Sequence, residues 1–126
     1  MMDENELSYV VIGAVIEVHR ELGPGLPEGV YEEALAVELE ARAIPFERER
    51  RVPVLYKDQL LESTFRLDFL IAGKLIIELK AVAEVSPLHE AQLLSYLKLT
   101  GCRLGLLINF NVERAKDGIY RKALNL

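Results

Sequence analysis

The sequence contains a single cysteine and no apolar run long enough to cross a membrane. One cysteine excludes an internal disulfide, and Cys102 has no Cys or His partner at the spacing of a zinc site. We expect Cys102 to be a small core residue, because free cysteine is commonly buried. A membrane-spanning helix needs about 20 apolar residues, and the acidic N-terminus does not resemble a signal peptide. The protein is therefore expected in the cytoplasm, with no membrane partner.

Positive charge is also scarce, since 15 Lys and Arg residues stand against 20 Asp and Glu residues and the formal net charge is −5. Indiscriminate binding to nucleic acid requires basic surface, so this balance argues against it. Two local groups of basic residues remain, and they are Arg48, Arg50, Arg51 and Lys57, and Arg103, Lys116, Arg121 and Lys122. Each group could follow the phosphates of a ligand, or it could keep a strand edge charged and solvated.

Hydrophobic patterning predicts a single α/β domain over residues 1–126, a length sufficient for a layered core. Three segments have helical periodicity or helix-capping sequences, and they cover residues 5–22, 27–43 and 86–100. Five segments have the apolar or alternating pattern of strands, and they cover residues 46–56, 60–71, 75–81, 103–110 and 118–124. The first three strands are expected to form an antiparallel meander. The fourth follows a helical crossover and should run parallel to the third, while for the fifth a helix stays open.

Two single residues carry a local interpretation. His19, close to the end of the first helix, is interpreted as a capping or hydrogen-bonded residue rather than a ligand, because the helix dipole favours it there. Pro53 indicates that the strand over residues 46–56 lies partly at an edge of the sheet, since proline cannot donate to a ladder.

The stretch of residues 66–80 is the most informative one in the chain. Its two strands are apolar on both faces, yet they carry Asp68, Glu78 and Lys80. A two-residue turn would put the two carboxylates on opposite faces, because a shift of one residue flips every side chain. A three-residue loop, Ala72-Gly73-Lys74, places Asp68 opposite Glu78 and Arg66 opposite Lys80. We predict that register, with a left-handed glycine in the loop.

Two carboxylates at cross-strand distance repel each other unless one is protonated or a divalent cation lies between them. An acidic site with oxygen ligands suits Mg²⁺ or Mn²⁺. The alternative is a buried ion-pair network, in which Lys80 bonds Glu78 and Asp68 and Arg66 lies across from Lys80. We favour the metal site.

Polar residues on two predicted helices accompany this stretch. Glu28 and Tyr31 share a face of the second helix, and Gln92 and Tyr96 lie one turn apart on the third. Each has an ordinary explanation of its own. An acidic residue favours the N-terminus of a helix, Tyr31 would be a half-buried aromatic, and the Gln92–Tyr96 pair could be merely interfacial.

Taken together, these residues resemble known motifs. The segment Gly25-Leu26-Pro27-Glu28-Gly29-Val30-Tyr31 resembles the GxxExxY signature for which one family of small proteins is named. The array Asp68 … Glu78-Leu79-Lys80 is similar to the core motif of the PD-(D/E)XK nuclease superfamily, to which that family is assigned. Gln92-x-x-x-Tyr96 matches a further motif of some branches. Leu67 stands where the superfamily's name has Pro, at a position that varies.

The resemblance implies a restriction-endonuclease-like core of the α/β class. Such a core has a central mixed sheet of four or five strands, an antiparallel meander plus one parallel strand, flanked by helices. It implies that Asp68 and Glu78, with the carbonyl of Leu79, hold Mg²⁺ or Mn²⁺. Glu28 would be an additional acidic group that reaches the site from the second helix.

The implied activity is metal-dependent hydrolysis of phosphodiester bonds in DNA or RNA, with nucleic acid as the partner. Lys80 would orient or activate the attacking water, while Gln92 and Tyr96 would position the phosphate or the metal-bound water. Two other functions stay open. One is a binding or regulatory module that keeps the nuclease fold without useful turnover, which could be a homodimer. The other is a metal-dependent phosphohydrolase that acts on a small nucleotide.

Overall fold

Five strands form one mixed sheet whose spatial order follows the chain, β1-β2-β3-β4-β5, in a computed structural model that describes residues 1–126. The strands are β1 (Phe46–Tyr56), β2 (Gln59–Ile71), β3 (Leu75–Lys80), β4 (Leu104–Asn109) and β5 (Ile119–Ala123). The helices are α1 (Glu4–Leu22), α2 (Glu28–Ala41), α3 (Pro87–Thr100) and a short 3₁₀ turn, η1 (Ala115–Gly118). All neighbouring strands are antiparallel except β3 and β4, which are parallel. The predicted mixed sheet with one parallel pair is therefore confirmed.

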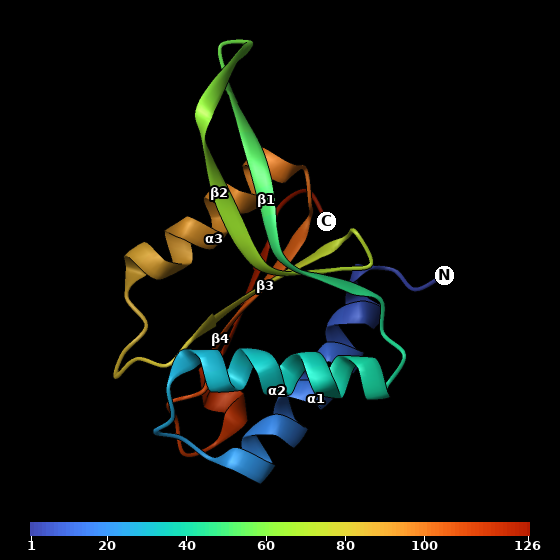
Figure 1. Cartoon of the computed structure of the whole chain (residues 1–126), viewed down its shortest axis with the longest axis vertical. Helices are drawn as coiled ribbons and strands as arrows, with labels where there is room; N and C mark the ends of the chain where they lie inside the picture. Colours follow the sequence, from blue (N-terminus) through green and yellow to red (C-terminus); the bar gives the residue numbers. More distant parts are fainter.

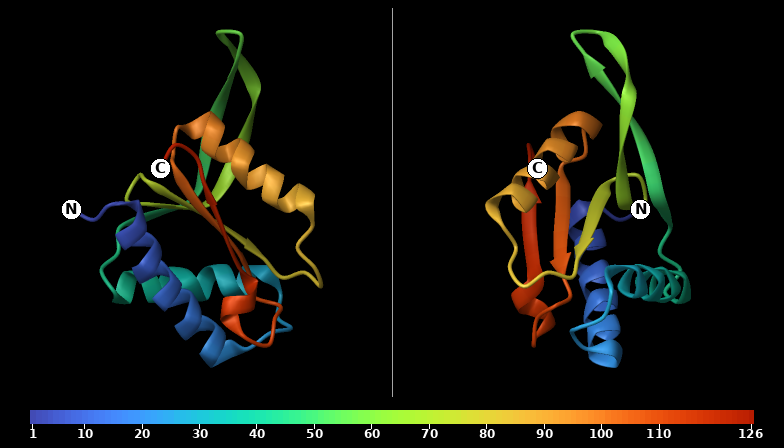
Figure 2. Two further views of the ribbon diagram at one scale, coloured as in Figure 1. Left: turned by 180° about the vertical axis from the view of Figure 1, so that it is seen from behind. Right: turned by 60° about the vertical axis from the view of Figure 1, so that its left-hand side comes forward.

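Helices cover both faces of the sheet (Figures 1 and 2). On one face, α1 and α2 pack their apolar residues against Phe69, Ile77 and Leu106 in the larger core cluster. On the other face, α3 packs Leu93 and Leu97 against the smaller one. Because both faces are covered, any charged residue in the middle strands must be accommodated inside the protein.

Local sequence signals fix the ends of the helices close to where the patterns predict them. Asp3 caps α1 and Ser86 caps α3, each through a side chain that accepts a backbone N–H three residues on. Pro27 is the N-cap of α2 rather than its first residue, and α2 ends at Ala41, slightly before the predicted end. His19 is buried, and its Nε2 donates to the carbonyl of Val112 over 2.7 Å, which confirms the hydrogen-bonded interpretation.

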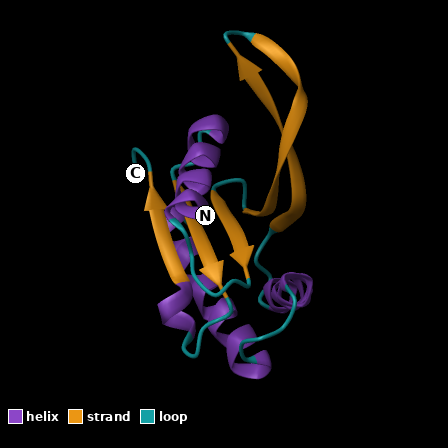
Figure 3. Ribbon diagram, turned by 90° about the vertical axis from the view of Figure 1, so that its left-hand side faces the viewer, coloured by secondary structure: helices purple, strands orange, loops and turns teal.

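The hairpin of β1 and β2 extends beyond the body of the molecule as an arm (Figures 1 and 3). Its tip is a two-residue turn at Lys57 and Asp58, both with positive φ, and Tyr56 beside it is 60% exposed. β1 is an edge strand, as Pro53 indicates, and its pairing with β2 shifts register between Pro53 and Leu55. Such a shift protects an exposed edge from pairing with another strand.

Cys102 packs against the smaller core cluster but is only half-buried, so the prediction of a buried core residue is met in part. None of the helices combines the length and the apolar composition that crossing a lipid bilayer requires.

Candidate active site

Asp68 and Glu78 face each other where β2 and β3 begin to separate. The ladder pairs Ile71 with Leu75, Leu70 with Ile76 and Phe69 with Ile77, and the same register places Asp68 opposite Glu78. The predicted three-residue loop is therefore present. Its left-handed residues are Ala72 (φ 50°) and Gly73 (φ 70°), and Lys74 N–H donates to the Ile71 carbonyl over 2.9 Å.

Side chains replace the ladder hydrogen bonds at this point. The Asp68 N–H donates to Glu78 Oε2, and the Leu79 N–H donates to Asp68 Oδ2, each over 2.8 Å. Each carboxylate is thus anchored by the backbone of the opposite strand. Both acids are buried, with Asp68 7% and Glu78 6% exposed. Oε1 of Glu78 accepts no hydrogen bond within the chain, and no buried polar atom lacks a partner, so this oxygen reaches solvent.

The predicted alternative, a buried ion-pair network, is not formed. Lys80 forms no ion pair, and the single ion pair to either acid is a long one, 3.8 Å from Arg66 Nη2 to Asp68 Oδ1. Burial and the charge of Asp68 raise the pKa of Glu78 from its ordinary value of 4.5 to about 8. Burial also raises the pKa of Asp68, although its hydrogen bond from Leu79 opposes the rise. Arg66 and Lys80 lower the pKa values of both acids, but each by less than burial raises them.

Glu28, the first residue of α2, is exposed. Partial desolvation and the charge of Asp68 raise its pKa, so its carboxylate lies within electrostatic range of Asp68. Tyr31 fixes the loop before it: the hydroxyl donates to the Gly23 carbonyl (2.5 Å) and accepts from the Leu26 N–H (3.2 Å). Tyr31 is fully buried, rather than half-buried as its ordinary explanation supposed. Its place in the GxxExxY segment is thus a structural one.

Glu32 is a further acidic residue near the site that the sequence analysis missed. Its charge raises the pKa of Asp68, and its Oε2 lies 3.0 Å from Arg48 Nη2 in an ion pair. A signal for it exists in the sequence, because Glu32 follows Glu28 by four residues and shares its helix face.

α3 brings Tyr96 to the acids but leaves Gln92 at the surface. The ring of Tyr96 stacks on Phe65 with centroids 4.5 Å apart. Burial and then the charges of Glu78 and Asp68 raise the pKa of its hydroxyl. Gln92, one turn earlier, is exposed, and its side chain makes no hydrogen bond within the chain. The predicted pair is therefore assembled only in part.

Lys80 ends β3 in a rigid backbone segment. Its carbonyl accepts from the Phe110 N–H over 3.0 Å, and the buried Asn109 side chain bonds both backbone groups of Val82 (3.0 and 2.9 Å). The charge of Lys80 lowers the pKa values of Glu28, Asp68 and Glu78, but this effect is smaller than the rise that burial causes. Its ammonium is thus close to the acids yet free of a direct partner.

A family model described as the PD-(D/E)XK nuclease superfamily matches residues 5–122. The chain belongs to this superfamily. No curated protein and no solved structure matches it. Membership confirms the resemblance at the level of the superfamily, whose members are generally nucleases that use divalent metal ions. The narrower GxxExxY family stays a prediction.

Within this PD-(D/E)XK domain the pair of acids can hold a divalent cation, but no third side-chain ligand stands beside it. No three acidic, His or Cys side chains lie close enough together to hold a metal. The predicted set of Asp68, Glu78 and Glu28 is therefore not assembled in this structure, although the charge of Asp68 acts on Glu28. The pair of Asp68 and Glu78 does fit Mg²⁺, because this ion keeps several waters and is commonly held through one or two carboxylates.

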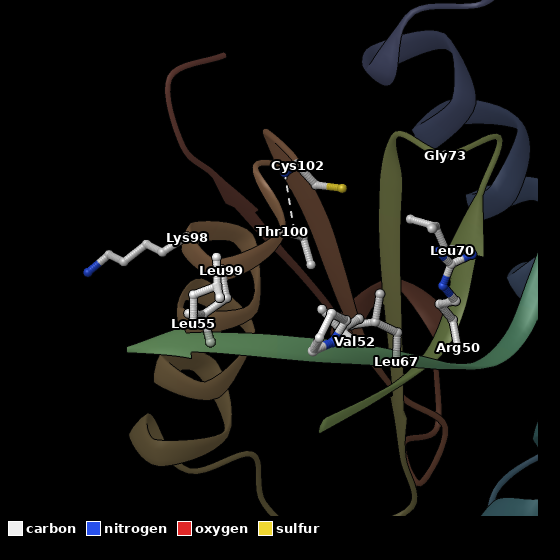
Figure 4. Close-up of a pocket in the computed structure, with 11 residues that line it drawn as sticks. Arg50, Val52, Leu55, Leu67, Leu70, Gly73, Lys98, Leu99, Thr100 and Cys102 are labelled. Atoms are coloured by element: carbon white, nitrogen blue, oxygen red, sulfur yellow. Dashed lines mark hydrogen bonds between the residues drawn. The ribbon is translucent and has the colours of Figure 1, made fainter. Parts of the chain in front are cut away.

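The largest cavity of the PD-(D/E)XK domain, about 490 Å³, lies apart from the acids. It opens between the base of the arm and the end of α3, and Figure 4 shows Val52 and Leu67 lining it from the arm and Leu99 from α3. Arg50 lines it too, so Arg50 points to the face of β1 that carries Val52. None of the predicted site residues contributes to its wall.

Proposed function

We propose that this protein is a divalent-metal-dependent nuclease that hydrolyses phosphodiester bonds of DNA or RNA. The observation that carries the proposal is the buried pair of Asp68 and Glu78, which backbone N–H groups hold together and to which the chain's own cations make only one long ion pair. Ionising both buried acids at once is costly, as the raised pKa of Glu78 shows, and a divalent ion bound between them would remove that cost. Superfamily membership supports the same reaction class.

Each residue of the proposed site has its own role in the reaction. Asp68 and Glu78 would hold Mg²⁺ or Mn²⁺, which supplies Lewis-acid stabilisation and lowers the pKa of a bound water. Lys80, close to the acids and unpaired, holds the attacking water and the phosphate electrostatically. Glu28 and Tyr96 bond waters at the edge of the site, and Gln92 contacts the substrate from the surface of α3.

Purified protein should be mixed with supercoiled plasmid, single-stranded DNA and RNA, each with Mg²⁺, Mn²⁺ or EDTA. We expect cleavage of at least one polymer with metal, none with EDTA, and loss of activity by a factor of about 10² or more in Lys80→Ala. Lys98→Ala is the matched control, because Lys98 is exposed, forms no ion pair and lies on the last turn of α3. Equal activity of the two variants would contradict the role of Lys80.

A second candidate is a nuclease-fold binding module without turnover. It is favoured by the net charge of −5 and by the absence of a third carboxylate at metal-ligand spacing. Tight metal binding with all three polymers left intact would support this module. Release of product from a mononucleotide, with intact polymers, would instead support a small-nucleotide phosphohydrolase.

A further inference from the structure

A pair of arginines lies directly opposite each other beside the acid pair. Arg51 on β1 and Arg66 on β2 are cross-strand partners, so their side chains leave the same face of the arm. Arg66 also reaches the acids, with its Nη2 3.8 Å from Asp68 Oδ1. Like charges placed directly opposite each other in an antiparallel pair destabilise it. An anion bound between the two guanidinium groups would relieve this repulsion.

The neighbouring arginines of β1 already have partners within the chain. Arg48 pairs with Glu32 (3.0 Å) and Arg50 with Glu47 (2.6 Å). Arg51 is exposed and forms no ion pair, so its guanidinium is free to bind a ligand. The basic group recognised in the sequence is thus not one continuous phosphate track, because Arg50 faces the cavity on the other side of the strand.

Arg66 is held loosely enough to change partners. Its Nη1 lies 3.2 Å from Glu49 Oε1, and both side chains are about half-exposed, 44% and 53%. An ion pair between exposed side chains contributes little to stability, so an anionic ligand can displace Glu49 at low cost. Two guanidinium groups then offer planar, multiple donors to one phosphate.

The distance along β2 between Arg66 and Asp68 suits a polymeric ligand with regularly spaced phosphates. Arg66 precedes Asp68 by two residues on β2, a step of about 6.6 Å along a strand. That step is comparable with the separation of successive phosphates along one nucleic-acid strand. We propose that Arg51 and Arg66 form a second phosphate site, which binds the phosphate adjacent to the scissile one in a nucleic-acid strand. The inference rests on the proposed nuclease function, and it selects a polymer over a free nucleotide as the substrate.

The test measures binding and cleavage separately. Fluorescence anisotropy with a labelled single-stranded oligonucleotide, in Ca²⁺ and across a range of salt concentrations, gives the dissociation constant and its salt slope. We expect Arg51→Gln to weaken binding about tenfold and to reduce the slope of log K against log salt by about 0.7. Arg50→Gln removes the same charge from the opposite face, and it should change neither. Glu49→Gln should tighten binding, because it frees Arg66, and a gain cannot come from misfolding.

Cleavage assays then separate this inference from the proposed function. Equal effects of Arg51→Gln and Arg50→Gln, or no measurable binding by the wild-type protein, would overturn the second phosphate site, whatever the cleavage result. Selective loss of binding in Arg51→Gln without any metal-dependent cleavage would keep the phosphate site and overturn the nuclease. Where cleavage occurs, Arg51→Gln should raise KM for an oligonucleotide and leave hydrolysis of a mononucleotide ester unchanged. An equal rise in KM for both substrates would refute the adjacent position.

Discussion

The pKa of Glu78 makes a direct prediction about stability without metal. Because burial and Asp68 raise this pKa to about 8, the folded protein holds a proton that the unfolded chain releases near pH 4.5. A raised carboxyl pKa contributes stability at low pH, and that stability is lost as the pH rises through the folded value. In EDTA, the free energy of unfolding should therefore fall between about pH 4.5 and 8. The rise in pKa sets an upper bound of about 4–5 kcal/mol on this fall in the free energy of unfolding. We expect about 2 kcal/mol, because Asp68 and Glu78 titrate as a coupled pair.

Glu78→Gln removes this dependence while keeping an oxygen that can accept from the Asp68 N–H. In EDTA at pH 8.5 the variant should be more stable than the wild type by about 2 kcal/mol, and at pH 5 the two should be similar. Urea denaturation at both pH values measures this, with Glu113→Gln, at an exposed position without an ion pair, as the matched control. Added Mg²⁺ should stabilise the wild type and leave Glu78→Gln unchanged. A wild-type stability that rises from pH 5 to 8, or a variant strongly destabilised at pH 8.5, would refute the reasoning.

Three further substitutions test residues that hold the loops and strands around the site in place. Tyr31→Phe removes the hydroxyl that bonds Gly23 and Leu26, and it should lower the free energy of unfolding by about 1–2 kcal/mol in chemical denaturation. Ala72→Gly relieves a positive φ in the β2–β3 loop and should raise thermal stability by about 0.5–1 kcal/mol, whereas a loss of stability would show that Ala72 is not strained. Asn109→Ala removes the oxygen that accepts from the N–H groups of Val82 and Asn111, so it should destabilise the fold by about 2 kcal/mol and speed amide exchange after β3.

The architecture could be predicted because its signals are local. Helical periodicity gave α1, Ser86-Pro87 gave the start of α3, and the crossover after β3 gave the parallel pairing with β4. The loop at Ala72-Gly73-Lys74 fixed the register that brings Asp68 opposite Glu78, because strand periodicity leaves only two choices of face. Each of these features is determined by a short segment of the sequence.

The balance of charges around the site could not be predicted, because it depends on residues distant in the chain. Lys80 shares a strand with Glu78, yet the only ion pair to either acid comes from Arg66 on β2. Glu32 raises the pKa of Asp68 from α2, and it pairs with Arg48 on β1. Arg51 differs from Arg50 in the face on which it emerges and in having no ion pair. A sequence pattern records that these charges exist but not which of them remain unpaired.

The crossed hydrogen bonds between Asp68 and Glu78 explain how the fold tolerates its own site. A separating pair of strands would leave the N–H groups of Asp68 and Leu79 without partners inside the protein, at a cost of about 1–3 kcal/mol each. The two carboxylates accept these N–H groups, so the acids stabilise the separation that the site requires. One oxygen of Glu78 is then left open to solvent. The same bonds therefore hold the strands in place and leave one carboxylate oxygen turned to solvent, where the proposed metal ion would bind.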